Sequence, residues 1–335
     1  MMAHRAAARS SMKTTLAPGD TGQLTGVIQL RRLSCAPKPP IAVGLGFGDR
    51  EFIGKNVSFR EEFPGKSDRL ASMPHLNNNG TNIYWEEHGS GEPLLLIMGL
   101  GASLDQWHRL LPAFSARYRT ILLDNRGVGK SDMPLGPYPI ATMAADARCV
   151  LTAAGVESAH VFGISMGGMI AQEFALQYPA CVRKLVLGCT SPGGPKVVRA
   201  DADANAMLMN RGQMTMDEAL AASIPILYDP HTPRERIDED LAIRRRTYPQ
   251  PAAFMNQLMG ILAWQSWDRL GSVAAPTLVI HGATDRLVPA GNGELIAERI
   301  PGAKWVLLPN AGHIFPTDQP ERSSAEILAF LAERN

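Results

Sequence analysis

The alternation of short apolar runs with amphipathic stretches from Thr81 onward is the feature that most constrains the fold of this chain. The runs have the length of buried strands, and several of the stretches between them have helical spacing. Such alternation is typical of β-α units wound right-handed around a largely parallel sheet. The expected strands are Thr81–Glu87, Pro93–Met98, Thr120–Asp124, Ala159–Gly163, Lys184–Cys189, Thr277–His281 and Lys304–Leu308. The expected helices are Met143–Ala154, Met166–Tyr178, Asn292–Arg299 and Glu321–Glu333. Because the first two strands lie too close together for a helical crossover, we expect them to form a hairpin.

Residues 191–270 break this rhythm, because they contain no β-branched run and are rich in helix-forming segments. The segment lies between two expected strands, which places it over the carboxyl ends of the sheet, where α/β proteins bind ligands. We therefore expect an α/β core at residues 73–190 and 271–335, with a helical cap at residues 191–270.

The first 72 residues differ in composition from the rest, with a net charge of +5 against −4 for residues 73–335. They show no sustained period of 2 or 3.6, which predicts a poorly structured leader that the core does not need. Four origins fit it: an upstream translation start, a disordered tail, a transit-like sequence or an export signal. The export signal is disfavoured, because no apolar h-region follows the basic start and Arg32 spoils a lipid-attachment site at Cys35. In a competing interpretation, Ile41–Gly48 adds a strand or folds over the mouth of the site.

The overall charge and the cysteines exclude several function classes. The net charge is +1, and no apolar run approaches the ~18 residues of a membrane span, so neither nucleic acid nor a membrane is an expected partner. Four cysteines show neither paired spacing nor the density of a disulfide scaffold, which predicts no metal site. They are Cys35, Cys149, Cys181 and Cys189. We expect a cytoplasmic monomer or homodimer that acts on a small molecule.

One serine stands between glycines directly after an apolar run, in the stretch VFGISMGG from Val161 to Gly168. The glycines suit a sharp strand-to-helix turn whether or not Ser165 is a nucleophile. A serine hydroxyl needs a histidine base, and that histidine needs a carboxylate to set its tautomer. Asp285 and His313 each follow the end of an expected strand, as Ser165 does. All three side chains are therefore expected at one rim of the sheet.

These segments resemble the α/β-hydrolase fold family from about Asn79 to Asn335. The resemblance is carried by GISMGG, GATDRLVP, NAGHIFP, LIMGLGASLDQW and LLDNRGVGKSD, which occur in the order and strand context of that family. It implies a mostly parallel sheet of the eight-stranded type flanked by helices, a Ser165–His313–Asp285 triad, and no metal or organic cofactor. It also implies an oxyanion hole formed by the backbone N–H groups of Met166 and Leu100.

The segment MGLG departs from the common pattern, because Met98 stands where many relatives have the histidine of a His-Gly pair. Met98 cannot make the hydrogen bonds of that histidine, so we expect packing to hold the loop. The variant resembles a bacterial subgroup of esterases, enol-lactonases and methylesterases. The side chains of Trp107, Trp264 and Met259 are candidates for the substrate pocket, although Met and Trp at such spacing are more often core.

The expected function is hydrolysis of carboxylic esters of short to medium acyl chain through an acyl-enzyme. Two other enzyme functions stay open, namely lactone hydrolysis of the enol-lactonase kind and hydrolysis of a carbon–carbon bond. Outside enzymes, the alternative is a ligand sensor that keeps the triad but turns over slowly. The loop from Asp124 to Asp132 suggests an anion site at first, but in such folds it more often ties neighbouring loops together.

Overall fold

One sheet of eight strands organises residues 75–334, which are the residues that the computed structural model describes. The expectations for the leader at residues 1–72 lie outside them. The strands are β1 (His75–Asn78), β2 (Thr81–His88), β3 (Glu92–Ile97), β4 (Tyr118–Leu123), β5 (Ala159–Ile164), β6 (Val182–Gly188), β7 (Thr277–Gly282) and β8 (Lys304–Leu308). The helices are α1 (Leu111–Ser115), α2 (Ile140–Ala153), α3 (Met166–Gln177), α4 (Ala202–Asn210), α5 (Met216–Leu227), α6 (Arg234–Arg246), α7 (Pro251–Leu262), α8 (Gly291–Arg299), α9 (Phe315–Asp318) and α10 (Pro320–Ala332).

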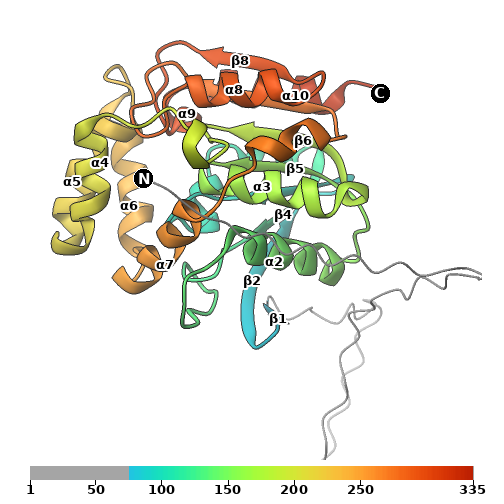
Figure 1. Ribbon diagram of the computed structural model, residues 1–335, viewed down its shortest axis with the longest axis horizontal. Helices are drawn as coiled ribbons and strands as arrows, with labels where there is room; N and C mark the ends of the chain where they lie inside the picture. Colours follow the sequence, from blue (N-terminus) through green and yellow to red (C-terminus); the bar gives the residue numbers. More distant parts are fainter. Residues whose placement is uncertain (1–74, 335) are drawn as a thin grey trace, which may run out of the picture. The chain divides into compact units, whose positions relative to one another are not determined.

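The strand order is β1-β2-β4-β3-β5-β6-β7-β8, and the run from β4 to β8 is parallel throughout (Figure 1). The antiparallel pairings are those of β1 with β2 and of β2 with β4. The expectation of a mostly parallel sheet is therefore confirmed. Parallel strands end at the same edge, so the loops that follow β3, β5, β7 and β8 all open on one rim.

The expected hairpin between the first two predicted strands is wrong, because β2 pairs with β4 and β3 lies on the far side of β4. The short link between β2 and β3 passes the start of β4 at very close range. A Cβ on Gly89 would lie 2.1 Å from the carbonyl oxygen of Ser115 and 2.6 Å from that of Tyr118. Glycine permits this passage, so a short connection here skips a strand instead of forming a hairpin.

The hairpin that does form joins β2 to β1, a strand that the sequence analysis did not expect. Its loop is the pair Asn79-Gly80, and both residues have positive φ angles, 51° and 87°. Asn-Gly with two left-handed residues is the preferred two-residue hairpin turn.

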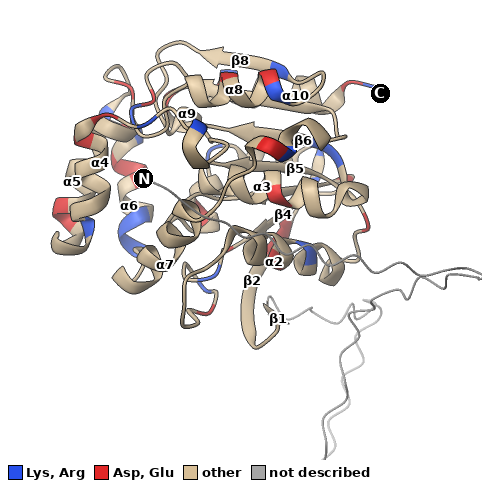
Figure 2. Cartoon of the chain, in the orientation of Figure 1, with Lys and Arg blue, Asp and Glu red and all other residues tan. Residues whose placement is uncertain are grey.

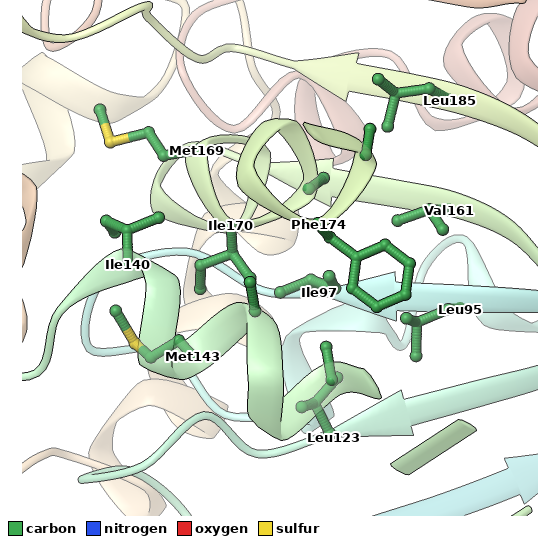
Figure 3. Packing of buried hydrophobic residues seen from close by; sticks show 14 of the residues in the cluster. Leu95, Ile97, Leu123, Ile140, Met143, Val161, Met169, Ile170, Phe174 and Leu185 are labelled. Carbon is green, nitrogen blue, oxygen red and sulfur yellow. The ribbon is translucent and has the colours of Figure 1, made fainter. Parts of the chain in front are cut away.

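Alternate residues of each strand pack on opposite faces of the sheet. On one face, Leu95 and Ile97 contact the cluster around Ile170 and Phe174 of α3, and α2 and α8 complete this layer (Figure 3). On the other face, Leu94, Leu96 and Phe162 pack with residues of α1 and α10. Burial on both faces explains why the central strands read as continuous apolar runs.

Helices α4 to α7 are inserted between β6 and β7, and Figure 1 shows them at one end of the sheet. Helices α4, α5 and α6 share a small core of their own that includes Met207, Leu220 and Leu241. Helix α7 instead contributes Ala253 to the main core. Within residues 75–334 no helix is both long and apolar enough to cross a bilayer.

Candidate active site

Ser165 lies at the turn that joins β5 to α3, with φ 58° and ψ −122°. A positive φ is strained for a serine and persists only where the surroundings enforce it. Close backbone contacts do so here. A Cβ on Gly163 would lie 2.1 Å from the Gly167 carbonyl oxygen, and one on Gly167 would lie 2.0 Å from the Ile97 carbonyl oxygen. The two glycines are therefore required by the turn, and the turn projects Ser165 at the rim.

The structure brings Ser165, His313 and Asp285 into one hydrogen-bonded chain. His313 Nε2 lies 3.0 Å from Ser165 Oγ, and His313 Nδ1 lies 2.8 Å from Asp285 Oδ2. These distances suit the tautomer in which Nδ1–H donates to the carboxylate and the serine hydroxyl donates to Nε2. Asp285 follows β7 and His313 follows β8, as expected from the sequence.

The Asp285 carboxylate is fully buried yet stays ionised. Burial alone raises its pKa, but the charge of His313 and hydrogen bonds from His281 and His313 overcome this and lower the pKa to about 2. Its other oxygen accepts the backbone N–H groups of Leu287 and Val288, at 3.0 and 2.8 Å. The carboxylate therefore holds one position and one charge state beside His313.

The loop after β3 passes directly over Ser165, and a Cβ on Gly99 would lie 3.0 Å from the Ser165 Cβ. Leu100 follows on this loop and lines the same cavity as Ser165. Met166 is the first residue of α3, so its N–H has no partner four residues back in the helix. The two expected donors thus come from the two segments that meet at Ser165.

Met98 packs in the core, as expected, and hydrogen bonds from other segments also hold this loop. Asn125 Nδ2 donates to the Met98 carbonyl oxygen at 2.8 Å. Gln257 Oε1 accepts the Gly101 N–H at 2.8 Å, and its Nε2 donates to the Arg126 carbonyl oxygen at 2.8 Å. Gln257 comes from α7 in the inserted segment and is fully buried.

The Asp124 loop ties neighbouring segments together. Asp124 accepts the N–H groups of Leu104 and Lys130, each at 2.8 Å. Arg126 makes two hydrogen bonds of 2.7 Å to the buried Asp146. The structural interpretation of this loop is confirmed, because the charged side chains of Asp124 and Arg126 are hydrogen-bonded within the fold.

A cavity of about 100 Å³ opens above Ser165. Its walls are mostly apolar and come from both the sheet rim and the inserted helices. We name it the Ser165 cavity. Trp107 lines it and packs against Phe162, with ring centroids 5.0 Å apart.

The other two pocket candidates lie elsewhere, and their assignment to the pocket is wrong. The indole N–H of Trp264 donates to Glu173 of α3 at 2.8 Å, and its ring packs in the main core. Met259 lies on α7 with half of its surface exposed. The sequence predicted helix-forming segments in this region but could not say which neighbours these side chains contact.

Among the described residues, one group has metal-ligating atoms close together, namely Cys189, Asp285 and His313. Burial and the Asp285 charge raise the pKa of the Cys189 thiol well above its usual range. Asp285 and His313 are already hydrogen-bonded to each other. These atoms fit a proton relay better than a metal centre.

Sequence reasoning missed three residues that support the site: Asn125, Gln257 and His281. Each is polar within an otherwise buried stretch, which is the signal that could have found them. His281 Nε2 lies 3.2 Å from Asp285 Oδ2 and 2.7 Å from the Val288 carbonyl oxygen. His281 and His313 therefore approach the same carboxylate oxygen, Asp285 Oδ2.

Comparisons with known proteins agree with this architecture. A model of the alpha/beta hydrolase fold matches residues 92–320. A relative named "Putative carbamate hydrolase RutD", from Azorhizobium caulinodans, is 34% identical over 268 residues, which cover 78% of this chain and 99% of the relative. Among solved structures, a hydrolase from Pseudomonas aeruginosa PA01 is 28% identical with a TM-score of 0.69, covering 79% of this chain and 100% of that chain. An esterase from Thermogutta terrifontis is 26% identical with a TM-score of 0.66, covering 77% and 96%. The chain therefore belongs to the α/β-hydrolase fold family.

Proposed function

We propose that this hydrolase cleaves carboxylic esters of short to medium acyl chain through a covalent acyl-enzyme. One observation carries the proposal. Ser165 Oγ, His313 and Asp285 form a continuous hydrogen-bonded chain, with distances of 3.0 and 2.8 Å, at the base of a largely apolar cavity. A serine with a base in contact and an oriented carboxylate behind that base is the arrangement that acyl transfer needs.

In the first half-reaction, Ser165 Oγ forms a bond to the ester carbonyl carbon while His313 Nε2 takes the hydroxyl proton. The tetrahedral intermediate then breaks its bond to the leaving alcohol, which receives that proton from His313. Water deacylates the enzyme by the same route, with His313 again as the base. Asp285 stays ionised throughout and stabilises the imidazolium, which its depressed pKa permits.

The oxyanion donors in this proposal are the backbone N–H groups of Met166 and Leu100. Each such donor is typically worth ~10²–10³ in turnover. The strained turn at Ser165 supports the role of Met166, because it fixes the start of α3 beside the nucleophile. The bond from Gly101 N–H to Gln257 supports the role of Leu100, because it fixes the adjacent peptide.

Residues 191–270 serve as a cap in this proposal, and the cap limits the acyl chain. Met207, Leu220 and Phe254 of the inserted segment line the Ser165 cavity opposite the sheet rim. Side chains from both sides enclose the space into which an acyl group would extend. A cap of this kind favours short and medium chains over long ones.

A screen of p-nitrophenyl esters from C2 to C16 tests the proposal. We expect sustained release of p-nitrophenol that peaks at short to medium chains, is lost in Ser165→Ala, and is accompanied by fluorophosphonate labelling of Ser165. A single burst of one acyl group per chain would favour the slow sensor. Turnover that survives in a folded Ser165→Ala protein would overturn the assignment of the nucleophile.

Carbamate hydrolysis is a second candidate, because the relative that is 34% identical is named as a carbamate hydrolase. The Ser165 hydroxyl would attack a carbamate carbonyl in the same way, with His313 as the base and the same oxyanion donors. A p-nitrophenyl carbamate series run beside the esters separates the two, since carbamoyl-enzymes generally deacylate more slowly than acyl-enzymes. A higher kcat/KM on carbamates would make them the preferred substrate class.

We also propose a cytoplasmic enzyme that is a monomer or a homodimer. Cell fractionation and light scattering coupled to size exclusion test the two parts separately. Recovery in the membrane fraction, or a larger assembly, would count against them.

A further inference from the structure

The wall of the Ser165 cavity carries two arginine side chains, and the proposed reaction does not use either of them. Arg211 begins the short helix η4 (Arg211–Gln213), and Arg244 lies in the last turn of α6, in the strongly basic stretch that Figure 2 shows in blue. Most of the surrounding wall is apolar. A guanidinium held in such a place loses part of its hydration, which is unfavourable unless a partner compensates.

Within residues 75–334, no carboxylate oxygen lies within 4.0 Å of a nitrogen of either guanidinium. Their neighbour Arg245 does have one, since its Nε lies 3.0 Å from Asp217. Asp240 is the acid in the cavity wall, but it is already engaged. It contacts Arg109 at 3.3 Å and His108 at 3.4 Å, and it accepts the Tyr228 hydroxyl at 3.2 Å.

Aromatic rings support Arg211 without using its N–H groups. Its guanidinium carbon lies 4.5 Å from the ring centroid of Phe254 and 5.0 Å from that of Tyr248. A guanidinium stacked on rings keeps its in-plane donors available for a planar anion. Burial lowers the pKa of Arg211, and so does the positive charge of Arg244, although Tyr248 acts in the opposite direction. The two cations are thus close enough to repel each other.

Gln106 lies in the same wall and contacts Arg244. Its Oε1 accepts a hydrogen bond from Arg244 Nε at 3.3 Å, which turns its amide nitrogen away from that arginine. That nitrogen is buried and has no hydrogen-bond partner among the described residues. The cavity wall therefore carries two guanidinium groups without a carboxylate partner, and Gln106 accepts a hydrogen bond from one of them.

We propose that Arg211 and Arg244, with Gln106, form an anion-binding subsite, so that the natural substrate carries an anionic group besides its scissile bond. The proposal rests on the proposed hydrolase function and names its substrate class. A carboxylate is the expected anion, because its planar pair of oxygens fits a guanidinium bidentately. Phosphate has the same acceptor chemistry and is distinguished by the test.

The test compares mono-p-nitrophenyl esters of succinate, glutarate and adipate with neutral p-nitrophenyl esters of the same main-chain length. The wild type should prefer the anionic ester in at least one pair, as measured by kcat/KM. In Arg211→Gln and in Arg244→Gln, the ratio of anionic to neutral kcat/KM should fall by about 10- to 100-fold, as expected for the loss of a charge-assisted bidentate contact. Arg246→Gln, an exposed arginine on the same helix, is the matched control and should leave the ratio unchanged.

A binding measurement separates this proposal from the proposed function. Calorimetric titration of glutarate, and separately of inorganic phosphate, into Ser165→Ala reports the subsite without turnover. Saturable glutarate binding that Arg211→Gln abolishes supports a carboxylate site, and tighter binding of phosphate supports an anion site for a phosphorylated substrate. A wild type that prefers neutral esters at every length, together with no saturable binding of either anion, would overturn the subsite even if ester hydrolysis is confirmed.

Discussion

Gln257 connects the inserted segment to the loop that carries the proposed Leu100 donor, so replacing it should separate stability from catalysis. Its side chain is fully buried and makes two hydrogen bonds of 2.8 Å, one with the Gly101 N–H and one with the Arg126 carbonyl oxygen. Gln257→Leu is one bond shorter and makes neither hydrogen bond. The substitution leaves the Gly101 N–H and the Arg126 carbonyl oxygen without these hydrogen-bond partners.

The expected size follows from these two groups. An unsatisfied buried polar group costs ~1–3 kcal/mol, so the free energy of unfolding should fall by ~2–6 kcal/mol, less what the new apolar side chain returns. Once the Gly101 peptide is released, the adjacent Leu100 N–H loses its fixed direction. If that donor is lost completely, kcat falls by ~10²–10³ with a smaller change in KM.

Gln257→Glu is the matched control, because its carboxylate still accepts the Gly101 N–H but cannot donate to Arg126. We expect it to be destabilised while keeping kcat within about tenfold of the wild type, since a single oxyanion donor is worth ~10²–10³ and this variant keeps the loop in place. Urea denaturation and p-nitrophenyl ester kinetics on both proteins measure the two effects. A folded Gln257→Leu protein with wild-type kcat would show that Asn125 alone holds the loop, and the reasoning would be refuted.

Three other predictions follow from the same geometry. Asp285→Asn should lower kcat by ~10⁴ with the fold kept, because an amide favours the wrong His313 tautomer; steady-state kinetics would contradict this if kcat stayed near the wild-type value. Burial raises the pKa of Asp318 to about 6 despite hydrogen bonds from Thr232 and from a backbone N–H. The native state therefore holds a proton that the unfolded chain releases near pH 4, and stability should fall as pH rises from about 4 to 6. Asp318→Asn should remove that fall and be more stable than the wild type at pH 8 by up to ~3 kcal/mol in urea titrations; a wild-type pH dependence in this variant would exclude Asp318 as its source. Gly163→Ala should cost at least ~3 kcal/mol, because its Cβ would overlap the turn, whereas Gly212→Ala, where nothing lies within 4 Å, should change stability by less than ~0.5 kcal/mol. Equal stability of those two variants would contradict the steric argument.

The elements that the sequence predicted best are those whose pattern depends on burial alone. Strands such as β5 and β7 are buried on both faces, so their apolar runs are unbroken and easily recognised. The loops that follow them had to lie at one rim once the strands were parallel. The meeting of Ser165, Asp285 and His313 could therefore be expected before any contact was measured, because it depends on topology and not on side-chain detail.

The failures share a different cause, which is contact between segments distant in sequence. The link through Gly89 passes β4, a strand that comes about thirty residues later, and no local pattern records that passage. Gln257 bonds to a residue 156 positions away. Trp264 satisfies its indole on α3, although its position in the sequence suggested the cavity. In each case a partner distant in sequence decided the surroundings of the residue.

The loop after β3, which carries the proposed Leu100 donor, shows both effects together. Many relatives hold this loop with a local histidine side chain. This chain has Met98 at that position, and Asn125 and Gln257 hold the loop through hydrogen bonds to its backbone. One of these two residues belongs to the sheet rim and the other to α7 of the inserted segment. The position of the loop that carries the proposed Leu100 donor therefore depends on how α7 packs, and so does the cavity wall, since Phe254 on the same helix contacts Arg211. The helix α7 therefore contacts both proposed features, because Phe254 packs on Arg211 of the proposed subsite and Gln257 accepts the Gly101 N–H beside the proposed Leu100 donor.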